Sequence, residues 1–263
     1  MIKKIDKEMR AKALEYLHAS PVNALAICEA AKYYGIDSEH FSLWGDFWVD
    51  GEIKCLFAKI EDVIYIFSNS PAVDTMDIYT FLRDNYIGYK YVIGQAEKIK
   101  GYQRHILFKY KREHSAMILN KKDLTVPDFS RQKATLISEA VAEEVAQFIN
   151  ESEDFKFHPL SPKAIMKYTE KYGGYYVRAR GRIAAVGIGC ANIRKLMSIS
   201  VLITDEKYKE DYGYTEMIVS RIAQSAFAAG YRGICTDNVS EGYEKALKRL
   251  GFEHSTQNLL LKR

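Results

Sequence analysis

Long apolar runs are missing from this sequence of 263 residues. Spanning a bilayer takes roughly 20 consecutive apolar residues, and no segment here approaches that length. The N-terminal segment also lacks the apolar core and the small-residue cleavage site of a secretory signal. We therefore expect a cytoplasmic protein with no membrane partner.

Cysteine is scarce, and no C-x-x-C pair occurs. The four cysteines lie far apart, each among apolar residues. They are Cys28, Cys55, Cys190 and Cys235. This pattern is typical of buried thiols and argues against disulfides or a zinc site, so the sequence predicts no metal.

Clusters of one charge sign are also absent. The 38 basic and 34 acidic residues are interleaved and give a formal net charge of +4. Nucleic-acid-binding surfaces usually show grouped basic side chains, so no nucleic acid is expected as a partner. Hydrophobic residues make up 48% of the chain, which is enough for packed cores in one large domain or two ordinary ones.

The first half of the chain has the patterning of an α/β domain. Apolar residues recur at helical spacing over residues 8–34 and are interrupted at Pro21, which predicts two helices. Residues 40–68 alternate between apolar and polar, with turn signals at Gly51 and Asp62, which predicts an antiparallel meander. The same reasoning predicts a helix over residues 72–85 and strands over residues 89–94 and 104–111.

Residues 120–132 are polar, contain a proline and show no periodicity, which indicates a linker. We therefore predict two domains, residues 1–125 and 126–263. In the second domain the pattern predicts helices over residues 135–152 and 161–173. These are followed by strands over residues 175–180, 183–189 and 196–204, a helix over residues 213–229, a strand over residues 232–237, a helix over residues 241–250 and a final strand over residues 252–263.

Two segments in this order carry a family resemblance: "VLITDEKYKEDYGYTEM" at residues 201–217 and "NVSEGYEKALKRLGF" at residues 238–252. From about residue 135 onward the chain resembles the GNAT superfamily of acyl-CoA-dependent N-acyltransferases. The resemblance implies an α/β fold of the α+β type, with a mixed central sheet flanked by helices. The N-terminal domain, with a smaller sheet and helices in a similar order, is interpreted as a degenerate, non-catalytic copy of the same fold.

In that family a strand end leads into the motif R/Q-x-x-G-x-G/A at a helix start. Backbone amides at such a helix start form a site for pyrophosphate. In the register that begins at Lys209, tyrosine occupies both small positions. Shifting by one residue brings Gly213 and Thr215 to these positions, but the motif then begins at Glu210. The loop is therefore expected to bind CoA less tightly than a complete motif would.

The resemblance implies acetyl-CoA as co-substrate. The residues expected to bind it, partly through their main chain, are Leu202, Ile203, Thr204, Lys209, Glu210, Asp211, Tyr212, Gly213, Tyr214, Thr215 and Asn238. A carboxylate about 6 Å from a phosphate would repel it by roughly 3 kcal/mol at an effective dielectric near 20. That penalty shrinks if the acidic side chains of this loop point to solvent while the amides face the ligand.

The family's usual tyrosine, which protonates the departing thiolate, falls at Leu247. Tyr243 lies one helical turn earlier on the same face, so it is either the replacement acid or a core aromatic. Asn238 either takes part at the catalytic and cofactor site or caps the following helix, since Glu241 stands three residues later. The general base is Asp205, a residue of the preceding helices, or absent.

These residues predict an acetyl-CoA-dependent N-acetyltransferase that moves an acetyl group to an amine by direct attack on the thioester. The expected partner is a small-molecule amine or peptide acceptor, and a homodimer is compatible with the sequence. The alternative is a catalytically inactive GNAT-like module that senses acyl-CoA or mediates interactions. One further candidate is a lone loop histidine, His158. Three tyrosines either line an acceptor pocket or pack in the core: Tyr172, Tyr175 and Tyr176.

Overall fold

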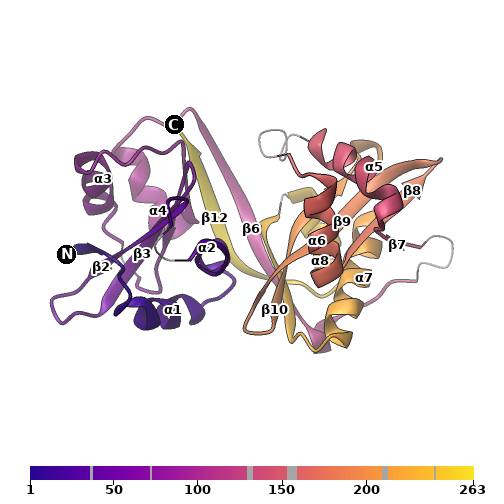
Figure 1. Ribbon diagram of the computed structural model, residues 1–263, viewed down its shortest axis with the longest axis horizontal. Helices are drawn as coiled ribbons and strands as arrows, with labels where there is room; N and C mark the ends of the chain where they lie inside the picture. Colours follow the sequence, from indigo (N-terminus) through magenta and orange to yellow (C-terminus); the bar gives the residue numbers. More distant parts are fainter. Residues whose placement is uncertain (36–37, 72, 129–132, 153–158, 209–212, 240) are drawn as a thin grey trace. The chain divides into compact units, whose positions relative to one another are not determined.

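The computed structural model describes residues 1–263 except 36–37, 72, 129–132, 153–158, 209–212 and 240 (Figure 1). The side chains of residues 191, 192, 237, 238 and 241 also fall outside the description. The chain forms two compact units: an N-terminal unit of Met1–Ala116 with Ser255–Arg263, and a C-terminal unit of Met117–His254. The division between residues 125 and 126 stays a prediction about functional domains.

The N-terminal unit alternates helices and strands. Its elements are β1 (Ile2–Lys4), α1 (Arg10–His18), α2 (Leu25–Tyr34), β2 (Phe41–Phe47), β3 (Ile53–Ile60), β4 (Val63–Phe67), α3 (Thr75–Asp84), β5 (Tyr91–Gln95), α4 (Ala96–Ile99) and the 3-10 helix η1 (Lys100–Arg104). The strands follow the order β1-β2-β3-β4-β5-β12, where β12 is Glu253–Lys262. The predicted antiparallel meander is confirmed, and β4 and β5 are parallel partners joined through α3.

The C-terminal unit repeats this arrangement. Its elements are the 3-10 helix η2 (Lys121–Asp123), β7 (Thr135–Leu136), α5 (Glu139–Asn150), α6 (Pro162–Tyr172), β8 (Gly174–Ala179), β9 (Arg182–Ile193), β10 (Leu196–Thr204), the 3-10 helix η3 (Glu206–Tyr208), α7 (Tyr214–Ala228), β11 (Gly233–Val239) and α8 (Glu241–Arg249). The strand order is β11-β10-β9-β8-β7, with β6 (Tyr110–Asn120) next to β11. The predicted α/β class, with mixed sheets flanked by helices, is confirmed.

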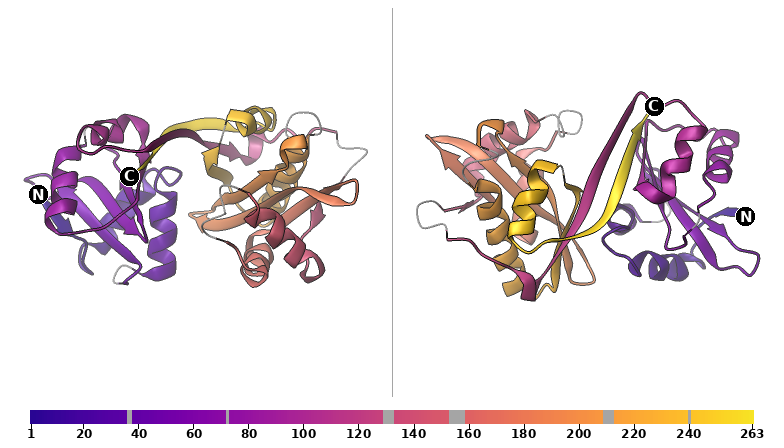
Figure 2. Two further views of the ribbon diagram at one scale, coloured as in Figure 1. Left: turned by 90° about the horizontal axis from the view of Figure 1, so that it is seen from above. Right: turned by 180° about the vertical axis from the view of Figure 1, so that it is seen from behind.

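Helices cover both faces of the C-terminal strands. On one face, α5 and α6 bury Val145, Ile149 and Ile165 against Val186 and neighbouring strand residues. On the other face, α7 and α8 enclose a separate core with β8, β9 and β10. Figure 2 shows these helices on opposite sides of the strands. The site described below lies on the α7 and α8 side, where β10 ends.

Two predicted elements differ from the structure. The strand expected over residues 104–111 begins only at Tyr110, because η1 extends through Arg104. It then continues to Asn120, where the linker was expected to start. Residues 114–117 are buried on both faces of this strand, so its sequence lacks the alternation by which a half-buried strand is recognised. Across the described residues, no helix is both long and apolar enough to cross a membrane.

Candidate active site at the end of strand β10

Strand β10 has one fully paired edge and one edge that is paired only at its start. It pairs with β9 from Leu196 through Thr204, with register shifts around Ile199. Its parallel pairing with β11 covers only Leu196–Ser198 against Gly233–Cys235. Among the described residues no further ladder pair joins β10 to β11, although β10 runs to Thr204 and β11 to Val239. The two strands therefore separate, and the last residues of β10 present an open backbone edge.

Hydrogen bonds at the strand end show which backbone groups face this opening. The Asp205 amide donates to the carbonyl oxygen of Ala184, which precedes Ala185 on β9, at 2.8 Å. The Thr204 amide points the other way and donates to the Tyr243 hydroxyl at 2.9 Å. Backbone groups alternate in direction along a strand, so the Leu202 amide and carbonyl face the opening as Thr204 does. Ile203 faces β9.

Of the three β10 residues expected to bind through their main chain, Leu202 and Thr204 therefore lie on the open edge. Ile203, opposite Val186, instead directs its amide and carbonyl toward β9. This distinction could not be read from the sequence, because it depends on the register with β9 and on the shifts around Ile199.

Tyr243 lies on helix α8, and its hydroxyl contacts the end of β10. The Tyr243 ring also packs against the hydrophobic core next to α7. The ring therefore contributes to packing, while the polar hydroxyl lies beside β10. When the phenol oxygen accepts the Thr204 amide hydrogen, its own O–H remains a donor. Leu247, at the family's tyrosine position, is fully buried. Tyr243 is therefore the α8 tyrosine that reaches the strand end.

The start of α7 lies next to the same strand end. Gly213 is the N-cap residue, with a left-handed conformation of φ 64° and ψ 20°, and as a glycine it has no side chain to cap the first turn. Glycine adopts this conformation at little cost. The amides of the first turn of a helix have no partners within the helix itself. Residues 209–212, which complete the predicted loop, lie outside the described residues.

A pair of hydroxyls ties β10 to α7. Thr204 Oγ1 and Thr215 Oγ1 lie 3.0 Å apart and are buried. Tyr214 is also buried, and its ring contacts the ring of Tyr208 at a centroid distance of 5.6 Å. The side chains of Tyr214 and Thr215 thus hold the strand end against the helix start, and any contact they make with a ligand falls to their backbone.

The remaining candidates are placed as follows. Asp205 uses one carboxylate oxygen within its own turn, accepting the Lys207 amide at 3.0 Å. Asn238 lies in β11 just before α8, as predicted, and its side chain falls outside the description. The Tyr175 hydroxyl is bonded to Ser225 on α7 at 2.5 Å, which matches the interpretation of core packing. His158 is not among the described residues.

Sequence reasoning missed one buried charge beside the site. Glu216 in the first turn of α7 is 5% exposed and pairs with Arg249 of α8, whose Nε lies 2.8 Å from Glu216 Oε1. The pair connects the two helices that carry Gly213 and Tyr243. A carboxylate in the first turn of a helix was visible in the sequence, but its partner 33 residues away was not. The described part of the chain contains no group of three metal-ligating side chains.

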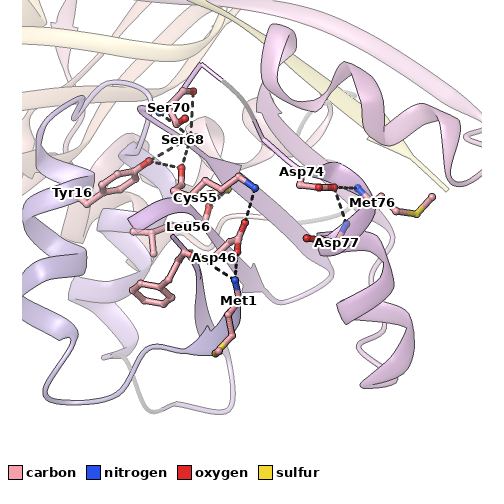
Figure 3. Close-up of polar contacts among 12 residues, drawn as sticks. Met1, Tyr16, Asp46, Cys55, Leu56, Ser68, Ser70, Asp74, Met76 and Asp77 are labelled. Carbon is pink, nitrogen blue, oxygen red and sulfur yellow. Dashed lines mark hydrogen bonds and ion pairs between the residues drawn. The ribbon is translucent and has the colours of Figure 1, made fainter. Parts of the chain in front are cut away.

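The N-terminal unit shows how such a helix start looks when it is closed. There α3 follows β4 as α7 follows β10, but the N-cap residue is Asp74. One carboxylate oxygen of Asp74 accepts the amides of Met76 and Asp77, each at 3.1 Å (Figure 3). At the start of α3 the N-cap side chain therefore supplies an anion, whereas Gly213, the N-cap residue of α7, has no side chain that could do so.

Comparisons with known proteins bear on the fold. A scan against models of protein families found no match, and neither did a search of curated proteins. Among solved structures, a GCN5-related N-acetyltransferase from Sphaerobacter thermophilus aligns over 100% of this chain and 95% of its own, with a TM-score of 0.68 at 11% identity.

Two further structures align over the whole of this chain. A GNAT-family acetyltransferase from Colwellia psychrerythraea covers 99% of its own length, with a TM-score of 0.57 at 11% identity. A tandem GNAT protein from the clavulanic acid biosynthesis pathway covers 98% of its own length, with a TM-score of 0.59 at 9% identity. The chain thus has the fold of the GCN5-related N-acetyltransferases.

Proposed function

We propose that this protein is an acetyl-CoA-dependent N-acetyltransferase whose site lies in the C-terminal unit. The observation that carries the proposal is the open edge of β10 beside the start of α7, where Gly213 is the N-cap residue. An extended, amide-containing chain such as pantetheine can add to an exposed strand edge through main-chain hydrogen bonds. A pyrophosphate suits the free amides of a helix start.

The residues present fit this co-substrate. The Leu202 amide and carbonyl offer a donor and an acceptor on the open edge. Gly213 has no side chain, so a phosphate can come close to the backbone there. Backbone hydrogen bonds to a charged phosphate contribute roughly 1.5–3 kcal/mol each. Acetyl-CoA supplies the activated acetyl group when bound, and the acceptor is a small-molecule amine or a peptide amine.

Tyr243 is assigned the proton transfer. Its hydroxyl accepts the Thr204 amide hydrogen at 2.9 Å, and its position at the end of β10 supports a role as proton donor to the departing thiolate sulfur. Holding the reacting groups in place contributes independently of any single acid. We assign catalysis to the predicted domain of residues 126–263 and none to residues 1–125, because Asp74 fills the equivalent helix start.

Calorimetry with acetyl-CoA and CoA on the full chain tests the binding step. We expect Gly213→Val to weaken binding at least tenfold, because a β-branched residue disfavours the left-handed conformation and crowds the amides. The matched control is Gly230→Val, at the other end of α7, where φ is also positive at 86°. The control should leave the affinity unchanged.

Two outcomes would contradict the proposal at different steps. No binding at millimolar ligand would rule out both an enzyme and a non-catalytic acyl-CoA sensor. Binding that is equally tight in Gly213→Val would place the phosphates elsewhere. If the ligand binds as expected, thiol release measured across a panel of amines separates the enzyme from the sensor, since only the enzyme releases CoA in an acceptor-dependent way.

A further inference from the structure

The N-terminal unit contains a pocket that the acetyltransferase reaction does not use. Its volume is about 380 Å³, within the range of small-molecule sites. The wall combines the turn after β2, strand β3, the start of α3 and η1, all in the N-terminal unit. Gly101 contributes to the wall where a Cβ atom would come within 2.8 Å of Thr75 Oγ1, so this side of the pocket is shaped by the absence of a side chain.

The pocket wall carries more positive than negative charge. Lys54 and Arg104 are cationic, His105 is a hydrogen-bonding group held by Thr75 Oγ1 at 3.0 Å, and Asp74 is the one carboxylate. Lys54 has a side chain that is only 15% exposed, and Asp46 holds its ammonium at 3.2 Å. Arg104 is exposed and has no ion-pair partner in the described part of the chain. An anion entering the pocket would therefore meet an uncompensated guanidinium.

The type of anion is restricted by Asp74. Its carboxylate already accepts the Met76 and Asp77 amides at the start of α3, so these amides are not offered to a phosphate. A second negative charge doubles the attraction to Arg104 as well as the repulsion from Asp74, so charge alone does not separate a phosphate from a carboxylate. A carboxylate needs no helix-start amides, and its planar shape suits bidentate contact with arginine.

Large apolar side chains stand beside these charges. Trp48 is 49% exposed and Met76 is 52% exposed, and both line the pocket. The Lys54 ammonium lies 5.0 Å from the centroid of the Trp48 ring, which fixes the ring at the rim. Exposed aromatic and thioether groups next to a cationic wall are suited to a flat ring carrying a negative charge.

We infer that this pocket binds a small aromatic carboxylate, with the carboxylate toward Arg104 and the ring against Trp48 and Met76. The inference is independent of acetyl transfer, because every contributing residue belongs to the N-terminal unit. It is tested by measuring ligand binding and not enzyme activity. It gives the unit without an open CoA site a ligand site of its own.

Calorimetry on the full chain with four probes of one ring size tests the charge preference: benzoate, benzamide, phenyl phosphate and benzylamine. Benzoate should bind tightest. Benzamide should be at least tenfold weaker, since it lacks the charge. Phenyl phosphate should bind no more tightly than benzoate, since the Met76 and Asp77 amides that a phosphate would use are bonded to Asp74. Benzylamine should not bind. Benzoate should also change the fluorescence of Trp48, the exposed one of the two tryptophans, because Trp44 is buried.

Two substitutions test the geometry: one is expected to weaken ligand binding and the other to strengthen it. Arg104→Gln should weaken benzoate about tenfold or more and leave benzamide unchanged. Asp74→Asn keeps a capping side chain and removes the like charge, so it should strengthen phenyl phosphate more than benzoate. Arg10→Gln, on exposed α1 outside the pocket wall, is the matched control and should change nothing.

Three outcomes would overturn the inference. Equal affinities for benzoate and benzamide would show that charge does not select the ligand. Unchanged benzoate binding in Arg104→Gln would place the carboxylate elsewhere. No binding of any probe at millimolar concentration would show that the pocket does not take this class of ligand.

Discussion

At the scale of single residues, one hydrogen bond defines the candidate site. The Thr204 amide would be a free donor at the end of an unpaired edge, and the Tyr243 hydroxyl accepts it. Aligning the family pattern places the tyrosine position at Leu247, which is buried in the core. The hydroxyl of Tyr243, one turn earlier on the same face of α8, reaches the strand end instead.

Tyr243→Phe tests the role of this hydroxyl. We expect kcat for acetyl transfer to fall by about 100-fold to 10,000-fold, the usual contribution of a positioned acid, while the Kd for acetyl-CoA changes less than tenfold. Tyr175→Phe removes a hydroxyl that bonds to Ser225 on α7 and should retain near-normal kcat. Full activity of Tyr243→Phe would remove this residue from the mechanism.

At the scale of elements, the two units use the same strand–helix–strand connection with opposite helix starts. In β4-α3-β5 the N-cap residue is Asp74, whose carboxylate caps the helix, and in β10-α7-β11 the N-cap residue is Gly213, which has no capping side chain. An aspartate before an amphipathic helix is a typical cap. The two N-cap residues together favour an external anion at the start of α7 over the start of α3.

The Asp74 cap can be measured through stability. Asp74→Ala should lower the free energy of unfolding by about 1 kcal/mol, within a usual range of roughly 0.5–2 kcal/mol, because two amides lose their acceptor. Asp74→Asn should be nearly neutral, since asparagine caps about as well. Urea denaturation of the two variants gives the comparison, and equal losses in both would show that charge, and not capping, is what Asp74 contributes.

The elements with strong local signals were predictable, and those set by distant contacts were not. The helix predicted over residues 161–173 begins with a serine at the N-cap and a proline in the first turn, which are typical helix-start residues, and Ser161 and Pro162 take these places in α6. Strand β6 was misplaced because its middle is buried on both faces and carries no alternation. The partial pairing of β10 with β11, which creates the candidate site, has no local signal at all, because it depends on two segments more than 30 residues apart.

At the scale of the whole molecule, the chain contains 19 tyrosines, and several of them are buried. Tyr102 is fully buried, and its hydroxyl lies 2.8 Å from that of Tyr89. Burial raises the pKa of both phenols above the usual 10.0, and the hydrogen bond between Tyr102 and Tyr89 adds to the rise for Tyr102. Both groups therefore stay protonated in the folded chain at pH values where they ionise in the unfolded chain.

This difference predicts instability in alkali. A group whose pKa is raised by folding makes its full contribution to the free energy of unfolding below its unfolded pKa, which is 10.0 for tyrosine. That contribution is lost as the pH rises above this value. Tyr102, whose pKa is raised far above 10.0, should lower the free energy of unfolding by up to about 1.4 kcal/mol per pH unit between its unfolded and its folded pKa. Urea denaturation at pH 9, 10 and 11 should show this slope, and Tyr102→Phe should reduce it. Tyr86→Phe, at a position 95% exposed, should leave the slope unchanged; equal slopes in all three proteins would show that the buried pair does not control alkaline unfolding.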